Sequence, residues 1–178
     1  MKMNENIKDR IRTSISGFTL PRYQDIPNVG LYLEQVTKYL QEYLSCLQDG
    51  CITGSMISNY VKKGLVENPV KKQYGRDQIA YLFFIAMAKN VLSLDNIDRF
   101  IGLQKKTYTT EVAYNYFCTE FENVLQKIFG LDDTPEESTA SFGDEKLMLR
   151  RTIVAIAHKI YLEKCFEAIL SEENPGRD

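Results

Sequence analysis

The sequence predicts an all-α protein that carries one small β-hairpin. Apolar residues recur at three- and four-residue steps through most of the chain, which is the spacing of amphipathic helices. Serine, threonine, asparagine and glycine stand where these segments should begin or end, as helix caps do. The stretch VENPVKKQYG, residues 66–75, has a different pattern, because β-branched residues are mixed with Asn-Pro and a glycine. That composition predicts a short hairpin.

The predicted elements follow in a simple order. Residues 1–17 are polar, with scattered charge, and predict a flexible N-terminal arm. Pro21 and Pro27 favour extended backbone and so predict an extended entry into the first helix, with Asn28 as its N-cap. Helices are then predicted at about residues 28–49, 54–63, 76–91, from 93 onward, 109–129 and 144–170.

Three helix ends and one helix interior give sharper predictions. Thr53 and Ser93 are expected to cap the second and fourth helices, and Gly64 to end the second one in a left-handed conformation. The third helix is apolar nearly all round, so it should be buried.

Composition excludes several classes of function. The net charge of -2 is not that of a protein that binds nucleic acid by overall charge, so any DNA site must rest on local charge. No apolar run reaches the length of a membrane span, which predicts a cytoplasmic protein with no membrane partner. The four cysteines have no histidine at zinc-finger spacing, and we expect neither a metal nor a cofactor.

The sequence offers no catalytic residues. His158 is the only histidine and lies within the last helix, where a structural or surface role is commoner than catalysis. No serine stands in a nucleophile-elbow motif, and no glycine-rich loop precedes a phosphate-binding lysine. The acidic pairs fall in residues 131–145, which contain no lysine or arginine and predict an acidic linker. We therefore expect that the protein is not an enzyme.

The second helix has two unlike faces. Its buried side is predicted to consist of Met56, Ile57, Tyr60, Val61 and Leu65, and its opposite side of Ser55, Ser58, Asn59 and Lys62. Serine and asparagine are poor helix formers, so an exposed face made of them needs a reason. Small hydrogen-bonding side chains let a helix enter the major groove of DNA and contact base edges. Tolerated surface residues beside a helix cap are the alternative explanation.

Local charge supports the groove interpretation. Between residues 53 and 76 the chain holds five cations, Lys62, Lys63, Lys71, Lys72 and Arg76, against one acid, Glu67. A basic cluster on a helix end and the next loop is the electrostatic pattern of phosphate contact. In isolation such lysines are more often a solvated surface, but the combination with the polar helix face predicts a winged helix-turn-helix that reads DNA.

The order of residues in this region resembles the DNA-binding head of the MerR regulator family. The matching positions are Tyr60, Gly64-Leu65, Tyr74, Arg76, Ile79, Leu82, Ser93-Leu94 and Ile97. The resemblance implies a recognition helix at 56–63 and a wing at 66–75, with Tyr60, Lys63, Lys71, Lys72, Tyr74 and Arg76 on the DNA backbone. The family usually has an arginine two positions before the tyrosine, where this chain has Ser58.

A wider stretch, about residues 18–103, resembles a bacterial family known as domain of unknown function 1836, the YkrK-like proteins. The matching segments are FTLPRY, LYLEQVTKYL, ITGSMISNYVKKGLV and KKQYGRDQIAYL. This resemblance implies no function of its own.

Together these observations divide the chain into a flexible arm (1–17), a winged helix-turn-helix domain (18–104), a C-terminal helical region (105–172) and a tail (173–178). MerR-type regulators pair through a long C-terminal helix. Here the last helix carries one apolar stripe, Leu149, Ile153, Ile156 and Ile160, and a second, Leu147, Val154, Tyr161 and Ala168. One stripe could face the core and one a second copy of the chain, or both could be buried within the domain.

The predicted function is a DNA-binding transcriptional regulator, with Ser55, Ser58, Asn59 and Lys62 in the major groove. The alternative is a protein–protein interaction module on a winged-helix fold that has lost DNA binding. Ser58 and the acidic overall charge favour the alternative.

Overall fold

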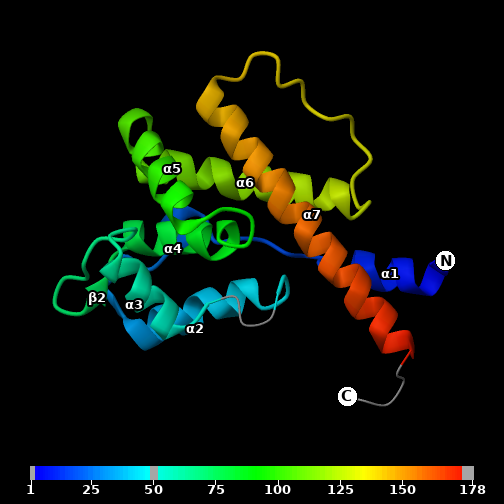
Figure 1. Ribbon diagram of the computed structural model, residues 1–178, viewed down its shortest axis with the longest axis horizontal. Helices are drawn as coiled ribbons and strands as arrows, with labels where there is room; N and C mark the ends of the chain where they lie inside the picture. Colours follow the sequence, from blue (N-terminus) through cyan, green and yellow to red (C-terminus); the bar gives the residue numbers. More distant parts are fainter. Residues whose placement is uncertain (1–2, 49–51, 174–178) are drawn as a thin grey trace.

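The computed structural model describes residues 3–48 and 52–173, and seven α-helices account for most of them (Figure 1). The elements are α1 (Glu5–Thr13), the 3-10 turn η1 (Tyr23–Asp25), β1 (Leu31–Tyr32), α2 (Leu33–Leu44), α3 (Gly54–Lys62), β2 (Gln73–Tyr74), α4 (Arg76–Ala88), α5 (Leu94–Thr107), α6 (Thr110–Ile128) and α7 (Asp144–Glu173). The predicted class, a mostly helical protein with a small β element, is confirmed.

α4 forms the centre of the N-terminal half, as its apolar sequence predicts. All residues of its last two turns are buried. The rings of Tyr39 and Tyr43 on α2 meet Phe83 edge to face, with centroids 5.9 Å away in each case. From the other side, Phe117 on α6 packs against Phe84 with centroids 5.3 Å apart. α4 is apolar all round because other helices cover it from both sides.

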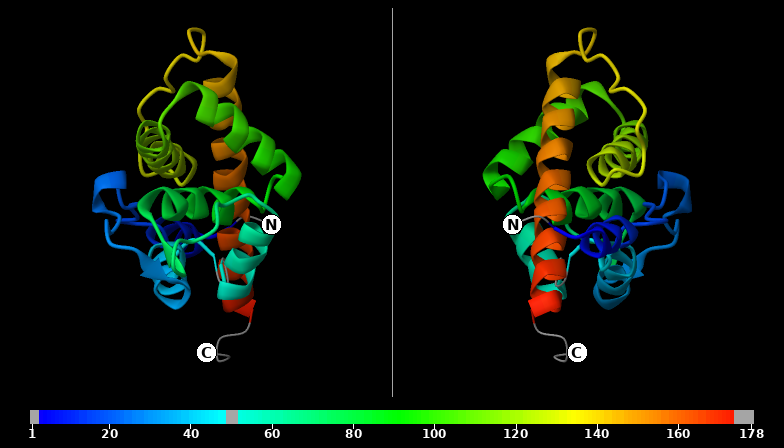
Figure 2. Two further views of the ribbon diagram at one scale, coloured as in Figure 1. Left: turned by 90° about the vertical axis from the view of Figure 1, so that its left-hand side faces the viewer. Right: turned by 90° about the vertical axis from the view of Figure 1, so that its right-hand side faces the viewer.

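α6 and α7 form the C-terminal half and pack along each other (Figures 1 and 2). Ile153, Ile156 and Ile160 of α7 are buried, and Ile156 and Ile160 line a small cavity together with Leu44 and Met87 of the N-terminal half. The Arg150 guanidinium lies 2.6 Å from a carboxylate oxygen of Glu120, and only 9% of each side chain is exposed. The second predicted stripe of α7 also faces the chain itself, since Tyr161 packs on Phe129 and Ala168 is buried.

The N-terminal segment differs from the prediction of a loose arm. Residues Glu5–Thr13 form α1, capped by Asn4, whose side chain accepts a hydrogen bond from the Ile7 N–H. Ile7, Ile11 and Ile15 follow at four-residue steps and are buried, and α1 lies against α7 (Figure 1). This narrow stripe becomes a helix face because α7, more than 130 residues away, provides the surface that covers it.

Three predicted helix ends are confirmed, and both ends of the first helix differ from the prediction. The hydroxyl oxygens of Thr53 and Ser93 accept the predicted N-cap hydrogen bonds, and Gly64 has φ +79°. The first helix, however, begins at Leu33, and Asn28 lies five residues earlier. Leu31 and Tyr32, which lie in between, form strand β1 and pair with β2, so the helix begins only after them. The same helix ends at Leu44, with Ser45 as its C-cap, about five residues before the predicted end near residue 49. Residues 174–178 of the predicted tail lie outside the described residues.

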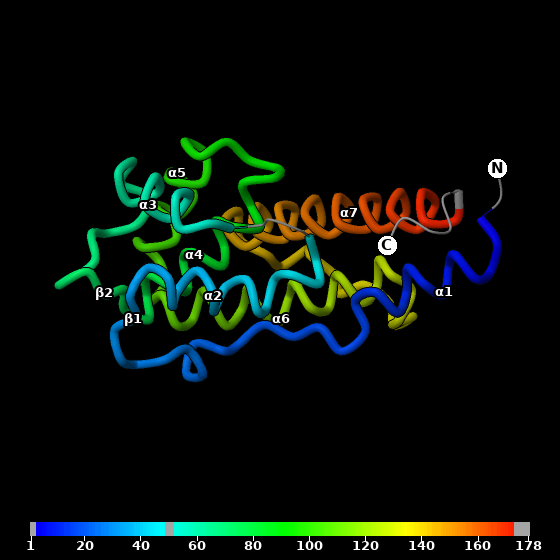
Figure 3. The backbone as a smooth tube through the Cα atoms, turned by 90° about the horizontal axis from the view of Figure 1, so that it is seen from below, coloured from blue at the N-terminus to red at the C-terminus, as the bar shows by residue number. Residues whose placement is uncertain are grey.

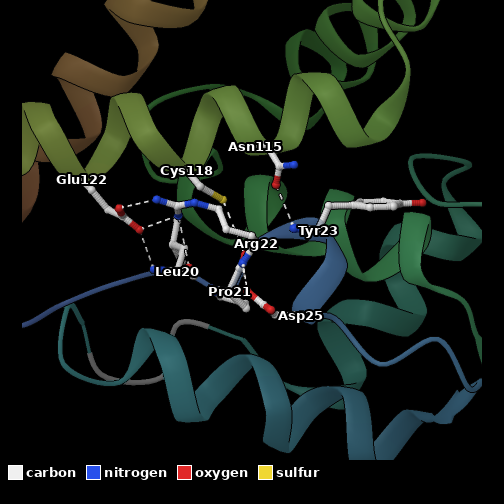
Figure 4. Close-up of polar contacts among 8 residues, drawn as sticks. All are labelled: Leu20, Pro21, Arg22, Tyr23, Asp25, Asn115, Cys118 and Glu122. Atoms are coloured by element: carbon white, nitrogen blue, oxygen red, sulfur yellow. Dashed lines mark hydrogen bonds and ion pairs between the residues drawn. The ribbon is translucent and has the colours of Figure 1, made fainter.

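The extended entry segment joins the N-terminal half to α6 (Figure 4). Arg22 donates two hydrogen bonds to the Glu122 carboxylate, at 2.8 and 2.7 Å, and the Leu20 N–H donates to the same group at 2.8 Å. The Tyr23 N–H donates to the Asn115 side-chain oxygen, also at 2.8 Å. These contacts hold the segment in the extended form that its prolines favour.

Candidate nucleic-acid interface

α3 has the two faces that the sequence predicts. Ile57 and Tyr60 are buried, Met56 and Val61 are half-buried, and the helix packs against α2. Ser55, Ser58, Asn59 and Lys62 are all exposed. The small polar side chains therefore occupy the solvent side of a helix that is fixed to the core from behind.

Gly64, in a left-handed conformation, ends α3. The Leu65 N–H donates to the Tyr60 carbonyl at 3.0 Å, and the Gly64 N–H to the Val61 carbonyl at 3.0 Å, which is the pattern of a glycine-terminated helix. The chain then turns inward, so that Leu65 and Val66 are buried while Lys62 and Lys63 stay exposed. Both lysines consequently lie at the end of α3 nearest the wing.

The wing is built differently from a self-contained hairpin at 66–75. β2 pairs antiparallel with β1, which precedes α2, in the register Leu31↔Tyr74 and Tyr32↔Gln73. On its other side Gln73 forms a bridge with Val70 alone. Pro69 has no N–H to donate, which explains why the pairing stops at Val70. A turn with a short strand is present in this segment, but the main partner strand comes from more than 40 residues earlier in the chain.

The tip of the wing consists of Lys71 and Lys72. Val70 and Gln73 exchange both backbone hydrogen bonds, at 3.1 and 2.9 Å, and the two lysines between them have φ +50° and +65°. Asparagine and glycine are the usual residues of such a two-residue turn, because other side chains cost roughly 1–2 kcal/mol each there. Both lysines are exposed, and the loop that carries them projects from the same end of the molecule as α3 (Figure 3).

Three predicted backbone contacts require correction. Tyr60 and Tyr74 are only 3% and 4% exposed, so their rings belong to the core rather than to the surface that DNA would meet. The Arg76 guanidinium donates to the carbonyl oxygens of Ile26, at 2.8 Å, and Gln24, at 3.3 Å. It also lies over the Tyr23 ring. Arg76 therefore holds the entry segment through two of its five N–H groups, and its side chain is directed towards that segment.

One contributor to the basic surface was missed. Lys105, near the end of α5, lies 3.6 Å from the Glu67 carboxylate at the base of the wing, and its ammonium lies 5.0 Å from the Tyr81 ring centroid. Glu67 is the only acid of the cluster, so Lys105 offsets its charge. Sequence patterns gave no signal for this residue because it is distant along the chain and only the fold brings it to the wing.

Seven of the predicted residues are exposed on α3 and the wing, which lie at the same end of the molecule (Figure 3): Ser55, Ser58, Asn59, Lys62, Lys63, Lys71 and Lys72. Elsewhere in the described ranges, no three His, Cys, Asp or Glu side chains gather as metal ligands would. His158 is exposed on α7. None of the helices within residues 3–48 and 52–173 combines the length and apolar character of a membrane span.

Comparisons with known proteins give a family and no further relative. A family model described as a domain of unknown function (DUF1836) matches residues 21–117, more than half of the chain. The match begins in the segment that Arg22 anchors and includes α3, the wing and α4. Neither the curated proteins nor the solved structures contained a match.

Proposed function

The chain belongs to the DUF1836 family, whose description assigns no function, and from its own residues we propose that it is a DNA-binding transcriptional regulator of MerR-like, winged helix-turn-helix type. In this proposal α3 enters the major groove and the wing tip contacts phosphates of the adjacent backbone. Ser55, Ser58, Asn59 and Lys62 reach the groove, and Lys63, Lys71 and Lys72 reach the backbone.

The conformation of Lys71 and Lys72 is the observation that carries the proposal. Two consecutive left-handed residues without a glycine or asparagine break a local preference, and such positions concentrate at functional sites. A turn selected for stability alone would hold Asn-Gly. Lysine at both positions indicates that a function requires two exposed positive charges at the tip despite the conformational free energy that they cost. Contact with a phosphate backbone is such a function.

The composition of α3 supports the same function. An exposed helix face that only meets water would favour long charged residues with higher helix propensity. The side chains of Ser55, Ser58 and Asn59 are short, so they would let the helix backbone approach base edges closely. Lys62 and Lys63 at the end of the helix would lie towards the flanking phosphates.

A second function is favoured by an exposed apolar pair on the wing. Tyr32 and Val70 each pair with Gln73, one from either side, and are 53% and 74% exposed. Side chains directly opposite each other on antiparallel strands share one face, so Tyr32 and Val70 lie on the same face, with Gln73 between them, beside the lysines. A protein partner could bind there, and Ser58 in place of the arginine usual in MerR-type heads agrees with this alternative.

Binding of the purified chain to a pool of random duplex DNA, with enrichment and sequencing, tests the proposal. The expected result is one enriched motif, whose affinity falls steeply as salt is raised because phosphate contacts release counterions. A folded protein that enriches no motif, and whose duplex binding is not salt-dependent, would reject DNA recognition and favour the protein-partner function.

A homodimer through α7 is part of the proposal in a revised form. The second apolar stripe predicted for a partner is covered by the chain itself, but Leu162, Phe166 and Leu170 remain 55%, 64% and 58% exposed at four-residue steps. These three residues, rather than Leu147, Val154, Tyr161 and Ala168, would face a second copy. A two-fold dimer would present two α3 helices to a palindromic site.

A further inference from the structure

Two adjoining cavities lie where α5, α6 and the first turns of α7 meet. The inner one holds about 60 Å³ and the outer one about 230 Å³, and Phe100, Gln104, Ala113 and Leu149 line both. The start of α7 lies close to α5 and α6 in two perpendicular views (Figures 1 and 2). An apolar cavity of roughly 150 Å³ is enough to bind a molecule the size of benzene.

Among the residues that line the inner cavity, Tyr81, Gln104 and Thr110 pair their polar side-chain atoms with one another, whereas the Tyr114 hydroxyl is buried and has no hydrogen-bond partner within the described residues. The Tyr81 hydroxyl donates to the Gln104 side-chain oxygen at 3.0 Å and lies 3.3 Å from the Thr110 hydroxyl. The Gln104 amide nitrogen donates to the Tyr108 carbonyl at 2.7 Å. Aromatic and aliphatic side chains form the remaining wall. Because most of the lining is apolar and the polar atoms of Tyr81, Gln104 and Thr110 are already paired, an apolar group is the occupant that costs the least free energy.

The outer cavity carries a cation at its edge. The Lys146 ammonium lies 3.8 Å from the Phe142 ring centroid and 5.0 Å from that of Tyr116. In the described part of the chain no carboxylate forms an ion pair with Lys146. The neighbouring Glu145 carboxylate instead accepts a hydrogen bond from the Thr107 hydroxyl at 2.9 Å. Aromatic faces hold this ammonium, which leaves it able to pair with an anion from outside.

We propose that the two cavities form a binding site for a small apolar carboxylate, either an alkyl or an aryl acid. The apolar body lies between Phe100, Ala113 and Leu149, and the carboxylate meets Lys146 at the edge. Apolar depth with one charged group at the entrance is the usual construction of a ligand pocket. The site does not depend on DNA recognition, because ligand binding is measured on the chain alone.

Titration of isotope-labelled full-length protein, followed by amide chemical shifts, tests the site. Octanoate and 3-phenylpropionate distinguish alkyl from aryl acids, and 1-octanol is the uncharged match. We expect shifts at the lining residues and octanoate binding roughly 2–5-fold tighter than octanol, the worth of one partly exposed ion pair. Lys146→Gln should abolish that difference and leave octanol binding unchanged.

A variant that fills the cavity provides a second test of the binding site. Ala113→Trp places a ring in the space shared by both cavities and should remove octanoate binding, whereas the matched Phe166→Ala, on the exposed face of α7, should retain it. Shifts that gather around Leu162, Phe166 and Leu170, or octanoate binding that survives Ala113→Trp, would overturn the proposal. If Ala113→Trp does not fold, equal affinity of octanoate for wild type and Lys146→Gln overturns it instead.

Discussion

Arg22 donates two hydrogen bonds to the carboxylate of Glu122, across the junction between the entry segment and α6 (Figure 4). The same carboxylate accepts the Leu20 N–H, and Glu122 is 13% exposed against 36% for Arg22. The hydrogen bond to Glu122 is the chief reason that the pKa of Arg22 is raised above its ordinary value. One side chain therefore anchors three donors of a segment that has no helix of its own at this point.

Removing this anchor should loosen the entry segment. Glu122→Ala leaves the Leu20 N–H and the Arg22 guanidinium without their acceptor, and we expect a loss of roughly 1–3 kcal/mol in the free energy of unfolding. Urea denaturation measures it. Asn123→Ala, at the next and exposed position of α6, is the matched control and should change stability little. Equal effects of the two substitutions would show that the anchor has no special role.

A double substitution at the wing tip distinguishes the effect of the two lysine charges on DNA binding from their effect on stability. Lys71→Asn with Lys72→Gly gives the preferred residues of this turn, so stability should rise by roughly 1–3 kcal/mol, which is the strain relieved at two positions less the conformational entropy that glycine loses on folding. Affinity for duplex DNA should nevertheless fall, by roughly tenfold or more at low salt, and the logarithmic salt dependence should decrease by about two. Fluorescence anisotropy with the enriched duplex measures both quantities.

The control for the wing variant removes the same charge elsewhere. Arg10→Gln with Arg151→Gln also lowers the net charge by two, at exposed positions on α1 and α7. If both double variants weaken binding equally, the effect comes from net charge and the wing does not contact phosphate.

The serine at the MerR arginine position gives a gain-of-function prediction. Ser58 is exposed on α3, so Ser58→Arg fits without disturbing the core. It should add about one phosphate contact, with tighter duplex binding and a salt dependence steeper by about one. An arginine at this position that leaves the salt dependence unchanged would place the α3 face away from the DNA backbone.

Alkaline pH should destabilise the protein partly through Cys118. Burial raises the pKa of this thiol to about 12, whereas an unfolded cysteine ionises near 8.5. Above about pH 9 the unfolded chain therefore loses a proton that the folded chain keeps, so stability falls as pH rises, by up to ~1.4 kcal/mol per pH unit for this one group. Stability is unaffected by this group below pH 8. Urea unfolding between pH 7.5 and 10 should show a shallower decline in Cys118→Ala, and an identical decline would exclude the contribution.

Dimerisation through α7 is tested at Phe166. Phe166→Glu places a charge in the centre of the exposed apolar stripe and should give a monomer, while the fold is retained because the Phe166 side chain is 64% exposed. Light scattering coupled to gel filtration measures the mass. His158→Glu, exposed on the same helix, is the control. A wild-type chain that is monomeric at high concentration would exclude this interface.

Local patterns were enough to predict much of this fold. The caps at Thr53 and Ser93, the left-handed Gly64, the buried α4 and the polar face of α3 all follow from interactions within one or two helical turns. Such interactions depend on residues close in sequence, so the sequence alone determines them. The polar side of α3 and the clustering of its lysines are properties of the same kind.

Tertiary structure decided what depends on distant partners. α1 is a helix because α7 covers Ile7 and Ile11, and the wing has a strand because residues 31–32 reach β2. Burial of Tyr60 and Tyr74 and the inward contacts of Arg76 removed three residues from the predicted DNA surface. Lys105 joined it, and Lys146 came to the edge of an apolar cavity. A side chain's availability depends on what packs over it, and only the folded chain determines that.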